Sequence, residues 1–200
     1  MQAEYPEIIL ASASLARASI LGNAGVRFHQ RASSLDEKSE HELLSGRTSA
    51  QDAALYLAKR KAEIISELEP GAIIIGADQT LALDDEILQK PRTQAEARQQ
   101  LQKLRGRSHQ LHSAAVVLHR GGVKPFCDTA NLTMRDFSDE FLDWYLDSAS
   151  ESVFTSVGAY HFEGLGIHLF SEIDGDYFTI LGLPIIPILE ELRQLNILLT

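Results

Sequence analysis

The sequence predicts a single α/β domain built on a mixed β-sheet. Apolar runs of strand length, such as residues 72–78, alternate with segments of helical periodicity, and some neighbouring strands are joined by hairpin signals. Interspersed helices and strands of this kind are typical of an α/β fold. The 200 residues suffice for one domain with a sizeable core, and no repeat, low-complexity tract or long linker divides them.

The first predicted elements are a strand over residues 8–10 and a helix capped by Ser12 or Ser14. Arg17 falls in the first turn of this helix, where the helix dipole disfavours a cation unless an anion lies nearby. Strand, serine loop and helix start therefore form a candidate anion site. The alternative is a solvated arginine on a surface helix.

The next segment, residues 33–49, is polar and predicts a loop with at most one helical turn. A long helix follows it. Thr48 and Gln51 have the spacing of a capping box at its start, and Pro70 ends it.

The apolar run 72–78 predicts a central buried strand that ends at Asp78, followed by a hairpin that turns at Asp84. An aspartate at the carboxyl end of such a strand lies at the edge where open α/β sheets bind ligands. The alternative is an aspartate that only caps a turn.

Further along, Thr93 and Glu96 form a second capping box, which opens a helix that stops at Gly106. Two strands are predicted around residues 121–122, and Ser138 starts another helix.

The C-terminal third contains a glycine-rich segment at residues 157–166, a strand over residues 167–170 and an Asp-Gly turn. A last helix begins after Pro184.

Three further charged residues are candidates for a site. Lys61 lies four residues after Leu57 and four before Ile65, in the middle of an apolar helix face, where the alternative is a lysine that snorkels at the edge of the face. Lys90 precedes a proline and follows a strand, so its side chain can reach the same sheet edge as Asp78. Glu37 lies in the polar loop and by sequence logic alone is a solvated acid.

Net charge, cysteine content and the lack of several motifs argue against a number of function classes. The formal net charge of −10 disfavours a general nucleic-acid or anionic-membrane surface. The single Cys127 suits a reducing cytoplasm, and no signal peptide or membrane-spanning run is visible, so we expect a cytoplasmic protein. The sequence has no HExxH pattern, zinc-site spacing, Gly-x-Ser-x-Gly elbow or P-loop.

Seven segments taken in order resemble the Maf family of nucleoside triphosphate pyrophosphatases. They are "LASASLARASIL", "SLDE", "LAKRKA", "IIGADQTLALDDEILQKP", "LRGRSHQLHSA", "VGAYHFEGLG" and "GDYFTILGLP", and they cover nearly the whole chain. The resemblance implies one elongated Maf-like domain over residues 1–200, with two lobes around an active-site cleft, often as a homodimer. It also implies hydrolysis of a nucleoside triphosphate to the monophosphate and pyrophosphate with a divalent cation, Mg²⁺ or Mn²⁺.

The resemblance assigns roles by position. Asp78 matches the proposed catalytic base, and Glu37 is a candidate metal ligand. The expected substrate-binding residues are Ser12, Ser14, Arg17, Lys61, Gln79, Lys90 and Glu163.

Two departures from the family pattern affect the expected substrate. Ala16 stands where the family has a second arginine or an aromatic residue, so neither branch of the family is matched there. Gln79 is the residue of the branch that acts on 7-methyl-GTP, and Glu163 replaces the glutamine usual in the branch for dTTP and UTP. A carboxylate can accept from the two adjacent donors of guanine, whereas it meets the carbonyls of uracil lone pair to lone pair. The alternative is that Glu163 only caps the glycine turn.

We therefore expect a house-cleaning enzyme, which removes modified or non-standard nucleotides, with a preference for guanine-type bases. The alternatives are a dTTP/UTP pyrophosphatase and, in a different class, a nucleotide-binding regulator of septum formation without turnover.

Overall fold

A computed structural model describes residues 6–44, 46, 48–120 and 122–199. Parts of the predicted 33–49 loop and of the 121–122 turn therefore lie outside the described residues. The helices are α1 (Leu15–Asn23), α2 (Glu37–Leu44), α3 (Ala50–Leu68), α4 (Gln94–Leu104), α5 (Asp139–Ala149), α6 (Tyr177–Ile180) and α7 (Ile185–Gln194), with 3₁₀ segments η1 (Ser150–Phe154), η2 (Val157–Ala159) and η3 (Leu165–Leu169). The strands are β1 (Ile8–Ala11), β2 (His29–Gln30), β3 (Ile73–Leu83), β4 (Glu86–Leu88), β5 (Ser108–His119), β6 (Gly122–Met134) and β7 (Phe170–Asp174).

The described strands form one mixed sheet in the order β2-β1-β3-β5-β6-β7, with β4 paired to β3. β1 runs parallel to β2 and β3, whereas the β3–β4 and β6–β7 pairs are antiparallel. The predicted α/β fold with a central mixed sheet flanked by helices is thus confirmed. No helix in the described part of the chain is long and apolar enough to span a membrane.

The chain divides into two compact units. Unit 1 contains the described residues up to Gln79, the segment 113–128 and the residues from Tyr177 onwards, and unit 2 contains residues 80–112 and 129–176. β3, β5 and β6 each pass from one unit into the other. That residues 1–200 form a single domain stays a prediction.

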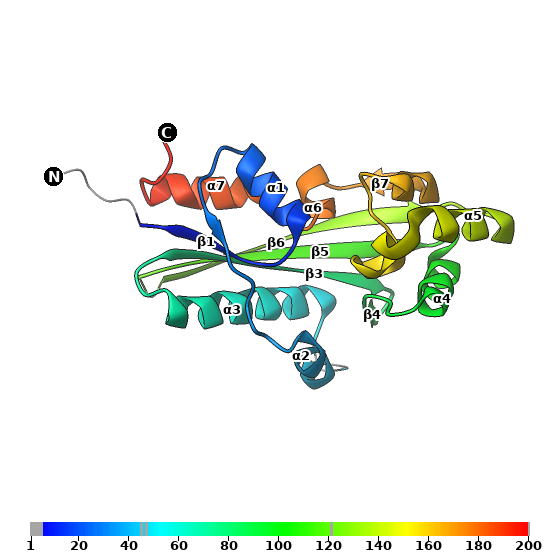
Figure 1. Cartoon of the computed structure of the whole chain (residues 1–200), viewed down its shortest axis with the longest axis horizontal. Coiled ribbons are helices and arrows are strands. Elements are labelled where there is room, and N and C mark those ends of the chain that lie inside the picture. Colours follow the sequence, from blue (N-terminus) through cyan, green and yellow to red (C-terminus); the bar gives the residue numbers. More distant parts are fainter. Residues whose placement is uncertain (1–5, 45, 47, 121, 200) are drawn as a thin grey trace. The chain divides into compact units, whose positions relative to one another are not determined.

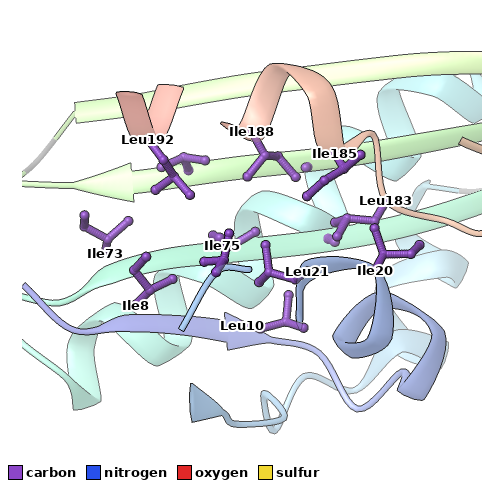
Figure 2. Close-up of a cluster of buried hydrophobic side chains, with 14 residues drawn as sticks. Ile8, Leu10, Ile20, Leu21, Ile73, Ile75, Leu183, Ile185, Ile188 and Leu192 are labelled. Carbon is purple, nitrogen blue, oxygen red and sulfur yellow. The ribbon is translucent and has the colours of Figure 1, made fainter. Parts of the chain in front are cut away.

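Unit 1 is a three-layer arrangement because both faces of its strands are apolar. Figure 1 shows α3 on one face of β1 and β3, with α1 and α7 on the other. Side chains alternate between the two faces of a strand, so Ile74 of β3 packs towards α3 while Ile73 and Ile75 pack towards α1 and α7. Figure 2 shows this second cluster, in which Leu192 of α7 approaches the strands.

Unit 2 has its own core. α4 packs against α5 and against η2, and the buried side chains there include Leu101, Leu104, Leu142 and Tyr145. The strand parts from β3, β5 and β6 continue here, and β4 and β7 complete the sheet.

Most predicted helix boundaries are confirmed by their caps. Ser14 accepts a bond from the Arg17 amide at the start of α1, and Thr93 accepts one from the Glu96 amide at the start of α4. The cap predicted for α3 is wrong by one residue. Ser49, and not Thr48, accepts a bond from the Asp52 amide and also donates to the Asp52 carboxylate.

Three other local predictions are wrong. The polar segment contains a two-turn helix, α2, instead of a loop. The Asp36 carboxylate accepts hydrogen bonds from Ser39 at the start of this helix, and the Tyr56 hydroxyl of α3 donates to Glu40. β3 does not end at Asp78 but continues to the hairpin, because it is buried along almost its whole length. The last strand starts at Phe170, after the 3₁₀ segment η3, rather than at residue 167.

Candidate active site

The end of β1 creates the first part of the site. β1 stops at Ala11, which pairs with Gly76, while β3 continues beyond it. Asp78 therefore lies just past the carboxyl end of β1, where the chain turns into α1. The sequence predicted a ligand-binding edge at the end of the strand that carries Asp78. The structure has such an edge, but β1 ends there and β3, which carries Asp78, continues.

The loop that follows β1 gathers serine hydroxyls and one guanidinium. Ser12 Oγ accepts from the Ser14 amide at 3.2 Å and from Arg17 Nη1 at 3.1 Å. Gln30 of β2 fixes this loop, since its Nε2 donates to the Ser12 carbonyl at 2.9 Å and to the Ser14 carbonyl at 3.3 Å. The predicted juxtaposition of Ser12, Ser14 and Arg17 is therefore present.

Two backbone carbonyls and one serine hydroxyl fix the position of the Arg17 guanidinium. Its Nε donates to the Gly182 carbonyl at 2.8 Å and its Nη1 donates to the Ala77 carbonyl at 2.9 Å. Its Nη2 has no hydrogen-bond partner among the described residues. Burial lowers the pKa of Arg17, while the charges of Asp78 and Glu37 oppose that shift. The guanidinium stays protonated, so Nη2 can donate to an anion.

Lys61 approaches Asp78 from α3, on the face of the sheet that lies opposite to α1 (Figure 1). Its Nζ lies 2.6 Å from Asp78 Oδ1 and 2.7 Å from Glu37 Oε1. The Lys61 and Asp78 side chains are each 7% exposed, whereas the Glu37 side chain is 48% exposed. The buried ion pair shows that Lys61 does not snorkel to solvent, and Glu37 is more than a solvated acid.

The Lys61–Asp78 contact depends on a close approach of α3 to β3. A Cβ placed on Gly76 would lie 2.1 Å from the Ala58 carbonyl oxygen and 2.8 Å from Ala62 Cβ. No other residue fits here, because a Cβ would meet helix backbone. Gly76 therefore sets the helix–strand distance at which Lys61 reaches Asp78.

Gln79 faces the other side of β3 from Asp78. Its Nε2 donates to Ser113 Oγ at 2.9 Å and to the carbonyls of Thr179 and Ile180, each at 3.1 Å. The amide nitrogen is thus already engaged within unit 1. A direct contact of Gln79 with substrate stays a prediction.

Lys90 and Glu163 belong to unit 2, and both are exposed. Glu163 lies in a turn that the Gly164 amide closes by donating to the His161 carbonyl at 3.2 Å. A Cβ on Gly166 would lie 2.4 Å from the same carbonyl oxygen, which keeps this turn compact. The substrate-binding roles of Lys90 and Glu163 stay predictions.

Sequence reasoning missed several residues that shape the site, namely Gln30, Gly76, Ser113, Thr179 and Gly182. Their partners lie far away in the chain, so no local pattern reveals them. The family resemblance was the available signal, because three of its segments contain Gly76, Ser113, Thr179 and Gly182.

The oxygen atoms of Asp78 and Glu37 are the ligands that a hard divalent cation prefers. No group of three metal-ligating side chains occurs in the described residues. Mg²⁺ is often bound by one or two carboxylates together with water and substrate phosphates, so this donor set fits such an ion.

Comparison with known proteins identifies the family. The family model described as "Maf-like protein" matches residues 7–195 of this chain. A protein of Rhizobium meliloti named "7-methyl-GTP pyrophosphatase" is 46% identical over 96% of this chain and 97% of its own length. A Brucella suis protein of the same name is 47% identical over 94% and 96%. A Rhodopseudomonas palustris protein named "Nucleoside triphosphate pyrophosphatase" is 46% identical over 96% and 95%.

Among solved structures, a HAM1 protein from Coxiella burnetii covers 66% of this chain and 74% of its own at 14% identity, with a TM-score of 0.42. A likeness this weak decides nothing about function. The family match and the identities to the named relatives extend over nearly the whole sequence, the segments of the candidate site included. The chain belongs to the Maf-like protein family.

Proposed function

We propose that this protein is a nucleoside triphosphate pyrophosphatase that hydrolyses a (d)NTP to the monophosphate and pyrophosphate. The observation that carries the proposal is the buried Asp78–Lys61 ion pair next to the serine–arginine anion site at the end of β1. The names of relatives at 46–47% identity support it.

The chemistry assigns a role to each charged group. The oxygen of a water molecule forms a bond to the α-phosphorus, and the bond from that phosphorus to the bridging oxygen breaks, releasing pyrophosphate. Asp78 orients this water and accepts its proton. Arg17 and Lys61 stabilise the negative charge on the phosphoryl oxygens, as Ser12 and Ser14 do through their hydroxyl and amide groups.

A divalent cation, Mg²⁺ or Mn²⁺, completes the proposal. Asp78 and Glu37 would hold it together with substrate oxygens, and the ion would neutralise charge on the phosphates. The family resemblance implies a homodimer, which we propose for this protein and which sedimentation at several protein concentrations tests. We also propose a cytoplasmic location, because a single cysteine suits a reducing compartment.

For the base, we propose a preference for 7-methyl-GTP or a related guanine-type nucleotide. Two of the relatives named above carry 7-methyl-GTP in their names. Glu163 supports the same choice, because an ionised carboxylate offers only acceptors and guanine presents two adjacent donors.

The test is a pyrophosphate-release assay of the purified protein with Mg²⁺ and with Mn²⁺, across normal and modified nucleotides. We expect the highest kcat/KM with 7-methyl-GTP, and we expect Glu163→Gln to shift relative activity towards UTP and dTTP. Exposed Glu172→Gln in the same unit is the matched control and keeps the wild-type preference.

Two outcomes contradict different parts of the proposal. A wild-type preference for UTP or dTTP over every purine nucleotide overturns the choice of base but leaves the pyrophosphatase assignment intact. Tight nucleotide binding without any pyrophosphate release overturns the enzymatic assignment and favours a nucleotide-binding regulator.

A further inference from the structure

A buried hydrogen-bond network lies behind the anion site, within unit 1. Ser113 Oγ accepts from Gln79 Nε2 at 2.9 Å and donates to the Thr179 carbonyl at 2.6 Å. The Thr179 hydroxyl donates to Asp128 Oδ2 at 2.7 Å. Ser113 is completely buried and Thr179 is 1% exposed. Buried polar groups are costly unless they are paired, so a network this well satisfied has a defined geometry.

The network lies where the chain passes between the units. Gln79, Ser113 and Asp128 are the unit 1 residues at the boundaries within β3, β5 and β6, and Thr179 comes two residues after the boundary at Tyr177. Side-chain hydrogen bonds therefore join all of these chain segments within unit 1. None of these bonds is part of the regular strand pairing.

A short turn connects the network to Arg17. The Gly182 amide donates to the same Thr179 carbonyl at 3.0 Å, and the Gly182 carbonyl accepts from Arg17 Nε at 2.8 Å. Gly182 has a φ of +96°, and a Cβ on it would lie 3.4 Å from Arg17 Nε. The Thr179 carbonyl thus receives donors from Gln79, from Ser113 and from the turn that holds Arg17.

We propose that the Asp128–Thr179–Ser113–Gln79 network is a positioning element for Arg17. It fixes the Gly182 carbonyl, which sets the orientation of the guanidinium whose Nη2 binds a phosphate oxygen of the substrate. Thr179 and Asp128 are thereby positioning residues for triphosphate binding, while they do not touch the substrate. The proposal rests on the proposed function for the identity of the anion.

The test measures binding of inorganic tripolyphosphate to the full chain by calorimetry in the presence of Mg²⁺. Thr179→Val removes the hydroxyl with little change of volume, and we expect it to weaken binding by about tenfold, the scale of one well-formed hydrogen bond to a charged group. Thr179→Ser keeps the hydroxyl and binds within about twofold of wild type. Asp128→Ala removes the acceptor of the same hydrogen bond, and we expect it to weaken binding as Thr179→Val does. It therefore tests the proposal independently if Thr179→Val does not fold.

A double-mutant cycle separates positioning from general stabilisation. Because the network acts through Arg17, Thr179→Val in an Arg17→Ala background causes no further loss of binding. Ser49→Ala, which removes the cap of α3 in the same unit, is the control: it lowers the melting temperature and leaves tripolyphosphate binding unchanged.

Additive losses in the cycle, or wild-type binding by both Thr179→Val and Asp128→Ala, overturn the proposal. So does failure of the wild-type protein to bind tripolyphosphate. In contrast, normal binding and a non-additive cycle without pyrophosphate release overturn only the proposed function.

Discussion

The two units both bury ionisable side chains, but they bury them in different states. In unit 1, Lys61 and Asp78 form an ion pair with Arg17 close by. In unit 2, His109 is 2% exposed, and burial lowers its pKa to about 4, so it is neutral at pH 7.

The buried groups of unit 2 form an uncharged cluster. His109 Nε2 and Tyr160 Oη are 2.8 Å apart, and the Tyr145 hydroxyl donates to the Ala159 carbonyl at 3.1 Å. Burial raises the pKa of both tyrosines. His109 Nδ1 is without a partner in the described part of the chain. This cluster belongs to the packing of the unit.

The difference indicates which cluster is functional. Taking charges out of water costs several kcal/mol per ion, and a buried ion pair often adds no net stability over apolar packing. Unit 1 nevertheless retains its charges, next to hydroxyls and to the Nη2 group that has no partner among the described residues. Such a cost is expected where chemistry requires the charge. The predictions below test this contrast.

The largest expected effect is on turnover. Asp78→Asn keeps the shape of the side chain and removes its charge and basicity, so we expect kcat to fall by roughly 10²–10⁴-fold while triphosphate binding stays measurable. Single-turnover pyrophosphate release and calorimetric binding check this. A variant that keeps more than about a tenth of the wild-type rate removes Asp78 from the role of general base.

The next effect concerns the distance between α3 and β3. Gly76→Ala places a Cβ against the Ala58 carbonyl, and we expect a loss of about 3 kcal/mol in the free energy of unfolding together with a lower kcat/KM. Gly22→Ala in α1 is the matched control, because its Cβ would meet only Phe28 Cε1 at 3.9 Å. Denaturant titration of both variants measures the difference. Equal stabilities for the two variants contradict the tight packing.

The cations of unit 1 come third. Lys61→Ala and Arg17→Ala should each weaken triphosphate capture or turnover by roughly 1–3 kcal/mol, the range for hydrogen bonds to charged groups. Steady-state kinetics at constant ionic strength measures the change in kcat/KM. If both variants keep normal kinetics and lose only thermal stability, the ion pair is structural and the contrast with unit 2 disappears.

The smallest effect is a pH dependence in unit 2. Between the ordinary pKa of 6.5 and the folded value of about 4, the unfolded chain binds a proton at His109 and the folded chain does not. The free energy of unfolding therefore falls as the pH falls through this range, by at most about 1.4 kcal/mol per pH unit from this residue.

His109→Gln removes that proton, so its unfolding free energy should fall less steeply with pH. His112, whose pKa is also lowered by burial, leaves a residual slope. Urea titrations at several pH values between 4 and 6.5 compare the slopes. Identical slopes for the variant and the wild type contradict the neutral buried state of His109.

The sequence predicted the elements well wherever local signals decide them. The caps at Ser14 and Thr93 were predictable because each hydroxyl accepts from an amide only three residues further along the chain, an interaction that does not depend on distant segments. The central strand was predicted from its apolar run, but its end was not. Asp78 looks like a stop signal, and only the pairing and burial of β3 on both sides show that the strand continues.

The site was predictable as a set of residues only through the family resemblance. Periodicity placed Lys61 on an apolar helix face and left its role open. The tertiary structure decided it, because Gly76 admits α3 close to β3 and the ammonium meets Asp78. Gln79 shows the same limit, since its amide donates to carbonyls 100 and 101 residues further along the chain.

The sequence by itself thus determined the α/β class, most of the helix starts and the identity of the charged residues. The tertiary structure alone decided which charges are buried, which groups pair with them and what holds Arg17 in place. The physical reason is that caps, turns and periodicity depend on interactions within about one turn of helix or a few strand residues. Burial and ion pairing instead depend on contacts between distant segments, whose energies arise only when those segments are packed together.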